Sequence, residues 1–283
     1  EKVKVHLDCY PCFLNQTIIA VRLGTKDEAK RQYILERIAG AIGRVDTSKT
    51  PAHTTTFLHR DIRDLIGEDP FKNIKAEYNQ IALNLYPALK KYVETSADPL
   101  WTASRLAIAG NVIDFGIFTS VDIEGTVRRA LAGPITVDDY SAFKDEINQH
   151  NEILYLLDNA GEIVFDRILI ETILSLGKKV KAVVKGSAVI NDSTIHDARE
   201  THLTEICTVI ENGSDAVGTI LEWTSQDFQD TFKKASFIIS KGQGNFETLV
   251  GLQKKIFFLF QSKCNVVSKE LGLSNGSMLL KKS

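Results

Sequence analysis

The chain has 283 residues, of which 43% are apolar and 25% charged, and its formal net charge is only -2. This length accommodates one large domain or two ordinary ones, each with a sizeable core. Because the sequence has no Lys/Arg run with interleaved aromatic residues, nothing indicates a nucleic-acid partner, and we expect a small-molecule partner instead.

No window approaches the roughly 20 uninterrupted apolar residues of a membrane span. The N-terminus lacks an apolar signal region, so we expect a cytoplasmic protein with no membrane partner. The oligomeric state leaves no readable pattern. Four cysteines are too few for a disulfide framework at this length, and we expect reduced thiols. They are Cys9, Cys12, Cys207 and Cys264.

The chain from about residue 10 to residue 150 has helical patterns throughout. Thr25-Lys-Asp-Glu28 has the spacing of a capping box. Three further helix starts combine a capping side chain with proline at the first helical position, where the missing N–H would be unpaired anyway. These starts are Thr50-Pro51, Asp69-Pro70 and Asp98-Pro99.

After His150 the pattern changes to short apolar runs that alternate with helical segments. This alternation is typical of βαβ units and a parallel sheet. The sequence therefore predicts the α/β class: a Rossmann-like, mainly parallel sheet with flanking helices in residues 151–283, and an all-helical region in residues 1–150 packed on it. The predicted strands are 153–157, 180–184, 207–210, 237–240 and 256–260.

Each predicted strand is followed by a polar or glycine-rich segment. Parallel strands place their carboxyl ends on one side of the sheet, where ligands bind in open α/β folds, so these segments should converge on one site. They are Asp158-Asn-Ala-Gly-Glu162, Lys185-Gly186 continuing to Asn191-Asp192, Glu211-Asn-Gly213, Lys241-Gly-Gln-Gly-Asn245 and Lys263-Cys264.

Three of these side chains, Asp158, Asn159 and Asp192, offer only hard oxygen ligands. Such ligands favour Mg²⁺ or Mn²⁺ over structural zinc. Two simpler interpretations remain open at this point. Asp158-Asn-Ala-Gly-Glu could be only a turn and helix cap, and Asp192 could cap the helix that follows it.

The segment Lys241-Gly-Gln-Gly-Asn245 adds a cation and two glycines, Gly242 and Gly244, that would let backbone N–H groups approach an anion. It lacks the spacing of a Walker A loop. An oxygen-ligated metal, a lysine and an anion nest together indicate phosphoryl chemistry. The alternative is a plain surface loop.

The ordered set of these motifs resembles the damage-control phosphatase family, formerly domain of unknown function 89. The Cys-x-x-Cys at Cys9 and Cys12 is similar to the archaeal-type branch of that family, and the helical region adds a matching Ala109-Gly-Asn-Val-Ile-Asp114. The chain has no clear Arg-Thr-x-Lys element of the eukaryotic sugar-phosphate branch. The resemblance runs from residue 9 to near the C-terminus.

The resemblance implies a metal-dependent phosphatase that uses Mn²⁺, Ni²⁺, Co²⁺ or Mg²⁺ and hydrolyses sugar phosphates or damaged metabolites. It implies that Asp158, Asn159 and Asp192 bind the metal, with Asp158, Asp192 and Lys241 as the catalytic residues. Residues implied to bind substrate are Asn111, Asp114, Glu162, Lys241, Gly242, Gly244 and Asn245. Read without the family, Gly110 would end the preceding helix and leave Asn111 and Asp114 in an exposed turn.

Several alternatives stay open from the sequence. Attack on phosphorus could come from a metal-bound water or from Asp158 as a covalent nucleophile. A Rossmann-like metabolite-binding or methyl-transferring protein is a second candidate function. Cys9 and Cys12, with Cys264 as a third thiol in space, could bind metal, form a redox pair or be plain buried thiols.

Overall fold

The computed structural model describes residues 3–112 and 131–283. Of residues 111 and 112 it describes the backbone alone. Its strands form one sheet in the order β1-β7-β6-β5-β2-β3-β4, and every neighbouring pair is parallel except β6 and β7. Their bounds are β1 (Ile135–Asp138), β2 (Glu152–Leu156), β3 (Lys179–Val184), β4 (Thr208–Glu211), β5 (Ile238–Lys241), β6 (Ile256–Gln261) and β7 (Met278–Lys282).

The five predicted strands are confirmed as β2 to β6, with ends that shift by no more than one residue. The prediction that residues 1–150 are wholly helical is wrong at β1, which joins the same sheet through β7. The strand β7 was not predicted either. β1 is an edge strand of the sheet, and β7 lies next to it. Four half-exposed residues in β1 carry too little apolar signal to be told from a loop.

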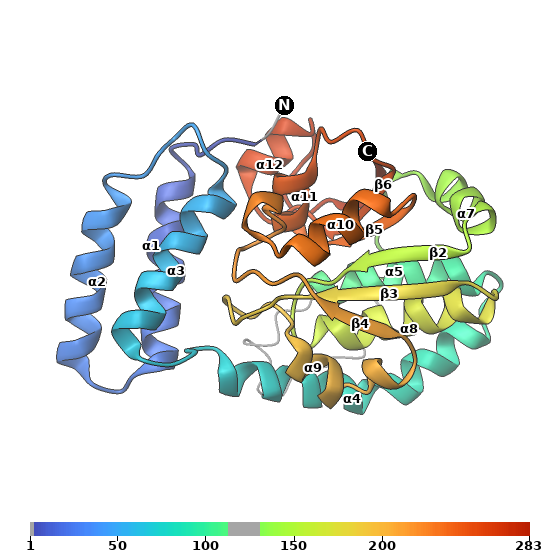
Figure 1. Cartoon of the computed structure of the whole chain (residues 1–283), viewed down its shortest axis with the longest axis horizontal. Helices are drawn as coiled ribbons and strands as arrows, with labels where there is room; N and C mark the ends of the chain where they lie inside the picture. Colours follow the sequence, from blue (N-terminus) through green and yellow to red (C-terminus); the bar gives the residue numbers. More distant parts are fainter. Residues whose placement is uncertain (1–2, 113–130) are drawn as a thin grey trace.

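Helices cover both faces of the sheet (Figure 1). Tyr155 and Ile239 point into a core shared with one helical layer, whereas Leu154 and Ile238 point into a core shared with the other. This alternation is the period-2 geometry of strands buried on both faces. The first layer contains α4 (Lys72–Glu94), α5 (Pro99–Val112), α7 (Tyr140–Gln149) and α8 (Glu162–Ser175), and the second contains α10 (Gln226–Lys234), α11 (Gln243–Leu249) and α12 (Asn265–Glu270).

Three further helices, α1 (Cys9–Gly24), α2 (Glu28–Ile42) and α3 (Pro51–Ile66), form a helical lobe beside the carboxyl ends of the strands (Figure 1). Ile34, Ile38 and Ile62 are among its fully buried core residues. Two arginines of α3 attach the lobe to the loop after β4, because Arg60 and Arg63 both pair with Asp215 at 2.5 Å.

Two predicted helix starts are confirmed in detail. Thr50 accepts a hydrogen bond from the N–H of His53 with Pro51 as the first helical residue, and Asp98 accepts from the N–H of Trp101. The predicted capping box at Thr25 is wrong: α2 begins two residues later than its spacing requires, and Asp27 caps it.

The expected helix end at Gly110 is also wrong, because α5 continues to Val112. A Cβ atom at residue 110 would lie 3.0 Å from the Cβ of Phe165 on α8. Glycine at this position therefore permits close packing between two helices, which is a second common use of glycine inside a helix.

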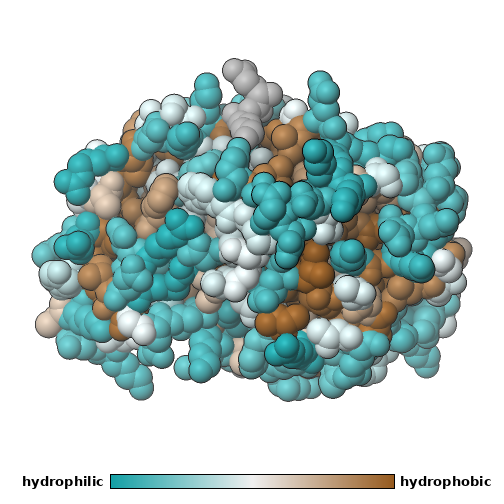
Figure 2. Space-filling view, in the orientation of Figure 1, coloured by the Kyte–Doolittle hydropathy of each residue, from teal (hydrophilic) through white to brown (hydrophobic). Residues whose placement is uncertain are grey.

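Most of the face shown in Figure 2 is hydrophilic, with smaller hydrophobic patches between the hydrophilic residues. Within residues 3–112 and 131–283, no helix combines the length and the apolar character that crossing a membrane requires.

Candidate functional site

The strand order reverses beside β2, whose neighbours are β3 on one side and β5 on the other. This is the topological switch point, where open α/β sheets bind ligands. Asp158 and Asn159 follow the carboxyl end of β2, and Gly242 follows that of β5. These segments therefore lie together at the carboxyl ends of adjacent strands, as the sequence predicts.

Backbone hydrogen bonds join the loop after β2 to the loop after β3. Asn159 and Asp192 form an isolated antiparallel bridge, and the N–H of Ser193 donates to the carbonyl of Asp158 at 2.7 Å. The N–H of Ala160 donates to the carbonyl of Asn191 at 2.8 Å. The three predicted metal-ligand residues are therefore neighbours across two loops.

Asp158-Asn-Ala-Gly-Glu162 does form a turn at the start of α8, as the simpler interpretation holds, but neither Asp158 nor Asp192 caps a helix. Thr194, with Asp197 three residues later, forms the capping box of α9 (Ile195–Glu200), so Asp192 is not the cap. Gly161 is the N-cap residue of α8, and no side chain caps that helix end. The carboxylates of Asp158 and Asp192 are therefore not used in helix capping.

Gly242 has a role that the anion-nest hypothesis did not foresee. Its φ is +82°, and a Cβ atom built on it would lie 2.1 Å from Oδ2 of Asp158. Its own N–H donates to the carbonyl of Leu259. Glycine is required here because the Asp158 carboxylate occupies the space of a side chain.

Gly244 fills a similar structural need on the next turn. A Cβ atom there would lie 3.2 Å from the backbone nitrogen of Gly218. The loop that holds Gly218 therefore packs directly on the first turn of α11.

The charge balance at Asp158 and Asp192 favours a bound cation. Burial, with repulsion from Glu162 and Asp192, raises the pKa of Asp158 well above its ordinary value. Burial also raises the pKa of Asp192. A divalent ion between the two would remove this penalty and keep both carboxylates ionised.

The side-chain amide of Asn159 is oriented by two carboxylates. Its amide nitrogen donates to Asp158 at 2.7 Å and to Glu162 at 3.1 Å. In the described part of the chain, its amide oxygen has no hydrogen-bond donor. Two carboxylates and one amide oxygen suit Mg²⁺ or Mn²⁺, which retain several waters.

No group of three His, Cys, Asp or Glu side chains in residues 3–112 and 131–283 is already arranged around a metal position. The Asn159 oxygen would be the third protein ligand at this site.

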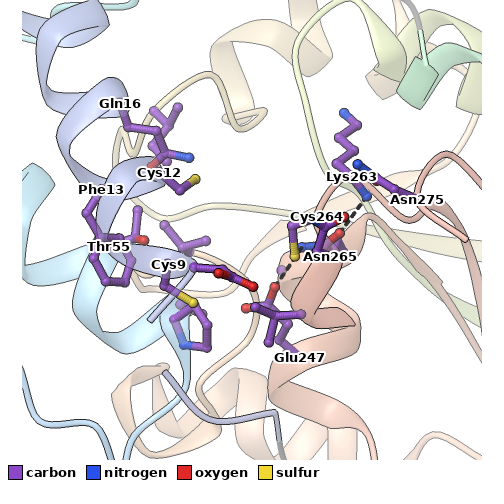
Figure 3. Close-up of a pocket in the computed structure, with 18 residues that line it drawn as sticks. Cys9, Cys12, Phe13, Gln16, Thr55, Glu247, Lys263, Cys264, Asn265 and Asn275 are labelled. Atoms are coloured by element: carbon purple, nitrogen blue, oxygen red, sulfur yellow. Dashed lines mark hydrogen bonds between the residues drawn. The ribbon is translucent and has the colours of Figure 1, made fainter. Parts of the chain in front are cut away.

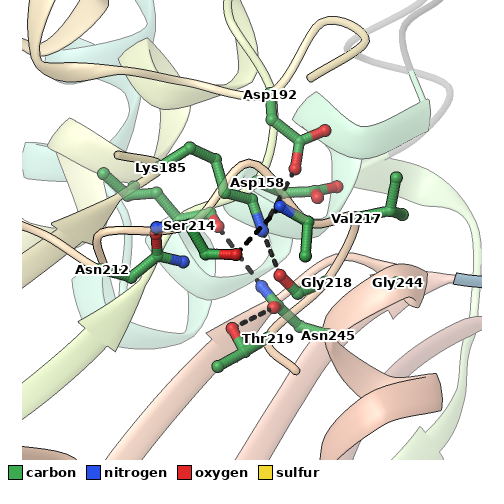
Figure 4. Close-up of polar contacts among 12 residues, drawn as sticks. Asp158, Lys185, Asp192, Asn212, Ser214, Val217, Gly218, Thr219, Gly244 and Asn245 are labelled. Atoms are coloured by element: carbon green, nitrogen blue, oxygen red, sulfur yellow. Dashed lines mark hydrogen bonds and ion pairs between the residues drawn. The ribbon is translucent and has the colours of Figure 1, made fainter. Parts of the chain in front are cut away.

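Lys185, at the end of β3, is a cation of the site to which the sequence assigned no role. Its ammonium lies 3.4 Å from Oδ2 of Asp192 and donates to the carbonyl of Gly218. Figure 4 shows it between these two groups, with Asp158 close by. Lys185 is buried, and two protein partners among the described residues leave one of its three N–H donors for a ligand.

Lys241, at the end of β5, points to the other face of the sheet from Lys185 and is fully buried. Its ammonium donates to Glu162 at 2.6 Å, to Asp166 at 2.7 Å and to the carbonyl of Ala107 at 2.8 Å. These three partners use all the N–H donors of a lysine. As the side chains stand here, a direct contact between Lys241 and a phosphate requires the loss of one of these bonds. The alternative interpretation, a plain surface loop, is wrong, because Lys241 ends β5 and Gly242 is the N-cap residue of α11.

The ion pairs of Lys241 orient the carboxylates around it. They raise its own pKa, which keeps the ammonium charged despite burial. Burial raises the pKa of Asp166 to about 7, against the opposing effect of Lys241. Glu162, paired with both Lys241 and Asn159, connects this ion cluster to the predicted metal ligands.

Asn245, a predicted substrate-binding residue, has a structural function in this arrangement. Its amide nitrogen donates to the carbonyls of Lys241 and Leu157, and its amide oxygen accepts from Thr219. These contacts hold the ends of β2 and β5 together. The side chain of Asn111 and the whole of Asp114 lie outside the described residues.

Asn79 on α4 is a residue that sequence reasoning missed. It is fully buried, its oxygen accepts from the N–H of Gly161, and its nitrogen donates to Asp197 and Glu200. It thereby joins the turn after β2 to α9. A polar residue inside an apolar helical stripe is the one signal that could have revealed it.

Ile190, two residues before Asp192, has a φ of +45°. A β-branched residue in this region is strained, and such strain is found most often at functional sites. The turn that presents Asp192 is therefore held by its surroundings rather than by local preference.

A cavity of about 390 Å³ lies apart from these residues, between the helical lobe and the segments after β5 and β6 (Figure 3). Cys9, Cys12 and Cys264 line it, together with Glu247 of α11. We call this cavity the cysteine pocket. The expectation that Cys264 joins the Cys-x-x-Cys pair in space agrees with this placement, and all four cysteines are free thiols.

Comparison with known proteins identifies the family to which the chain belongs. The family model described as the damage-control phosphatase ARMT1-like domain matches residues 5–279. The chain therefore belongs to this family.

Named relatives extend along the whole chain. A damage-control phosphatase of Pyrococcus horikoshii is 33% identical over 98% of this chain and 97% of its own length. A damage-control phosphatase of Archaeoglobus fulgidus is 31% identical over 99% of both. An uncharacterized protein of Methanocaldococcus jannaschii is 35% identical over all of this chain and 96% of its own.

A crystal structure of a DUF89 family protein from Pyrococcus horikoshii has the same fold. Its TM-score is 0.92 with 33% sequence identity, and the match covers 99% of both chains. The predicted α/β fold class is confirmed by this likeness.

The contact between Gly242 and Asp158 predicts a specific effect of a single methyl group. Gly242→Ala should lower the free energy of unfolding through left-handed strain of about 1–2 kcal/mol. The clash with the carboxylate should add about 1–3 kcal/mol. Urea denaturation measures both contributions together.

Gly251→Ala is the matched control, because its φ is +83° and no atom of residues 3–112 and 131–283 lies within 4 Å of its missing Cβ. This variant should lose only the part of the unfolding free energy that comes from left-handed backbone strain. Equal losses in the two variants would show that room for Asp158 is not the reason for glycine at position 242.

Proposed function

We propose that this protein is a metal-dependent phosphatase that hydrolyses small phosphate esters such as sugar phosphates or damaged phosphorylated metabolites. The observation that carries the proposal is the grouping of Asp158, Asn159 and Asp192 at the switch point of the sheet. The family membership and the printed names of the relatives support the same class of reaction.

Asp158, Asn159 and Asp192 would hold the divalent ion, which is Mn²⁺, Ni²⁺, Co²⁺ or Mg²⁺. When bound, such an ion supplies charge neutralisation at phosphoryl oxygens and lowers the pKa of water. The raised pKa values of the two carboxylates and the unused oxygen of Asn159 fit this assignment.

Lys185 supplies a fixed positive charge beside Asp192, at the position that this proposal assigns to the phosphoryl group. Its remaining N–H donor binds a phosphoryl oxygen, while Asp192 and Gly218 hold the ammonium in position. Lys241 acts one step further away. By pairing with Glu162 it orients the carboxylate that accepts from the Asn159 amide, and so turns the amide oxygen toward the ligand.

In phosphoryl transfer, positioning and charge neutralisation account for most of the rate enhancement. The methyl-transfer alternative has no supporting feature here, since the turn after β2 is Asp158-Asn-Ala-Gly-Glu162 and not a glycine-rich nucleotide loop.

Two nucleophiles are compatible with this arrangement, a water molecule and the carboxylate of Asp158. Covalent attack by Asp158 forms a phosphoaspartate that a second step hydrolyses. Acid quench within one turnover, followed by mass measurement of the intact chain, should detect the added phosphoryl group in that case. An unmodified chain during steady turnover would assign the attack to water.

Chelator-stripped protein should release phosphate from an aryl phosphate only after Mn²⁺, Co²⁺, Ni²⁺ or Mg²⁺ is added. Asp158→Ala and Asp192→Ala should each reduce this metal-dependent turnover by at least about 1,000-fold, because each removes a metal ligand. Asp145→Ala, an exposed aspartate on α7, is the control and should retain full activity.

Circular dichroism should show that the two site variants remain folded. Unchanged turnover in either variant would remove that residue from the site. A failure of every metal with a panel of phosphorylated metabolites would reject the phosphatase proposal.

Lys185→Met should reduce kcat/KM by about 100-fold, which is the usual effect of removing one charged donor from a developing oxyanion. Lys181→Met is the matched control, because Lys181 is an exposed residue of the same strand and should have no effect. A fully active Lys185→Met would assign the phosphate contact to another residue.

Lys241→Met should instead lower the free energy of unfolding by about 3–5 kcal/mol, because it leaves two buried carboxylates without a counter-charge.

A further inference from the structure

The cysteine pocket brings together three of the four cysteines of the chain from two separate parts of the fold. Cys9 and Cys12 belong to the first turn of α1, three residues apart on one helix face. Cys264 is the N-cap residue of α12, and Figure 3 shows its sulfur across the pocket from α1. Segments about 250 residues apart in sequence therefore direct thiols into one cavity.

A carboxylate completes this set of side chains. Glu247 of α11 is only 5% exposed and lines the same cavity. Its Oε1 accepts a hydrogen bond from Gln243 at 2.8 Å, and no cation pairs with it among the described residues. Burial raises the pKa of Glu247 to about 7, and the hydrogen bond from Gln243 opposes this only in part.

Two of the sulfurs already accept hydrogen bonds from neighbouring N–H groups. Cys9 Sγ accepts from the backbone N–H of His6 at 3.4 Å. Cys264 Sγ accepts from the side chain of Gln243 at 3.4 Å and from the backbone N–H of Val267 at 3.5 Å. Donors around the sulfur are the outer contacts that orient a thiolate ligand and disperse its charge.

We propose that Cys9, Cys12, Cys264 and Glu247 form a second metal site, of soft-ligand type, that takes Zn²⁺ or a similar borderline cation. Three thiolates and one carboxylate match the ligand number and ligand types of a closed tetrahedral zinc site. The site differs in ligand chemistry from the oxygen site at Asp158, so the two select different ions. Binding releases the thiol protons to solvent as each sulfur is deprotonated.

The same geometry distinguishes a metal site from a redox pair. A reactive cysteine needs neighbours that stabilise its thiolate, such as a lysine or a histidine cation. Lys263 also lines the pocket, but burial still raises the pKa values of Cys9 and Cys12, and Cys264 and Glu247 raise both of them further by like-charge repulsion. A cation among the four groups would offset this repulsion once the thiols lose their protons.

The four ligands do not yet surround a point, since no three of the metal-binding side chains in the described ranges are arranged to hold an ion. A closed site would therefore need rotation of the side chains of Cys12, which is exposed, and Cys264, which is partly exposed at the start of its helix. Metal binding would then link α1 to α11 and α12 across the cavity. This link would fix the helical lobe over the sheet edge.

Addition of Co²⁺ to fully reduced, metal-stripped protein tests this site. A near-ultraviolet sulfur-to-cobalt charge-transfer band should grow to one equivalent per chain and disappear when Zn²⁺ is added. This signal arises only from thiolate ligands, so Co²⁺ at the oxygen site does not contribute. The band should persist in Asp158→Ala, whatever that variant does to phosphatase activity.

Cys12→Ser and Cys264→Ser should each remove or strongly reduce the band, and Glu247→Gln should change the visible ligand-field bands. Cys207→Ser is the matched control, because Cys207 does not line the pocket, and it should leave the spectrum unchanged. Circular dichroism of each variant reports its folding.

The absence of the band in the reduced wild-type protein would overturn the proposal, as would its full retention in both Cys12→Ser and Cys264→Ser. A Cys9–Cys12 disulfide in the purified protein, with no metal uptake after reduction, would also overturn it in favour of a redox pair.

Discussion

The Asp158 carboxylate lies against the bare backbone of Gly242, and the rest of the site depends on this contact. It exists because β2 and β5 are adjacent parallel strands whose carboxyl ends open at the same point. Asn159, the bridge to Asp192 and the packing of α11 all follow from this position. A side chain at residue 242 would push the carboxylate out of the space in which a cation can reach it.

Much of the fold could be predicted from hydrophobic periodicity. The strands β2 to β6 are apolar runs buried on both faces, and such runs stand out between polar loops. The edge strand β1 and its neighbour β7 could not be predicted, because their register depends on each other and on β6 rather than on a pattern of their own. Two local predictions are wrong for a related reason. Asp27 caps α2 in place of Thr25, and the glycine at residue 110 serves a contact between helices instead of a helix end.

The site was predictable where one rule sufficed. Parallel strands bring their ends together, so the proximity of Asp158, Asn159 and Asp192 followed from the sequence. The face of the sheet to which each lysine points could not be predicted. Lys241 continues the face of Ile239 and reaches the carboxylates of α8, whereas Lys185 continues the face of Val183 and reaches Asp192. Alternation along a strand separates the two faces, but only the assembled layers show which face holds the ligand.

The attachment of the helical lobe has a consequence for the conditions in which the protein works. Arg60 and Arg63 share Asp215, and these partly exposed ion pairs are the main polar link between α3 and the loop after β4. Dissolved ions screen such partly buried charges much less than fully exposed ones. The attachment of the helical lobe to the loop after β4 should therefore tolerate a rise in ionic strength better than a link made of surface ion pairs would.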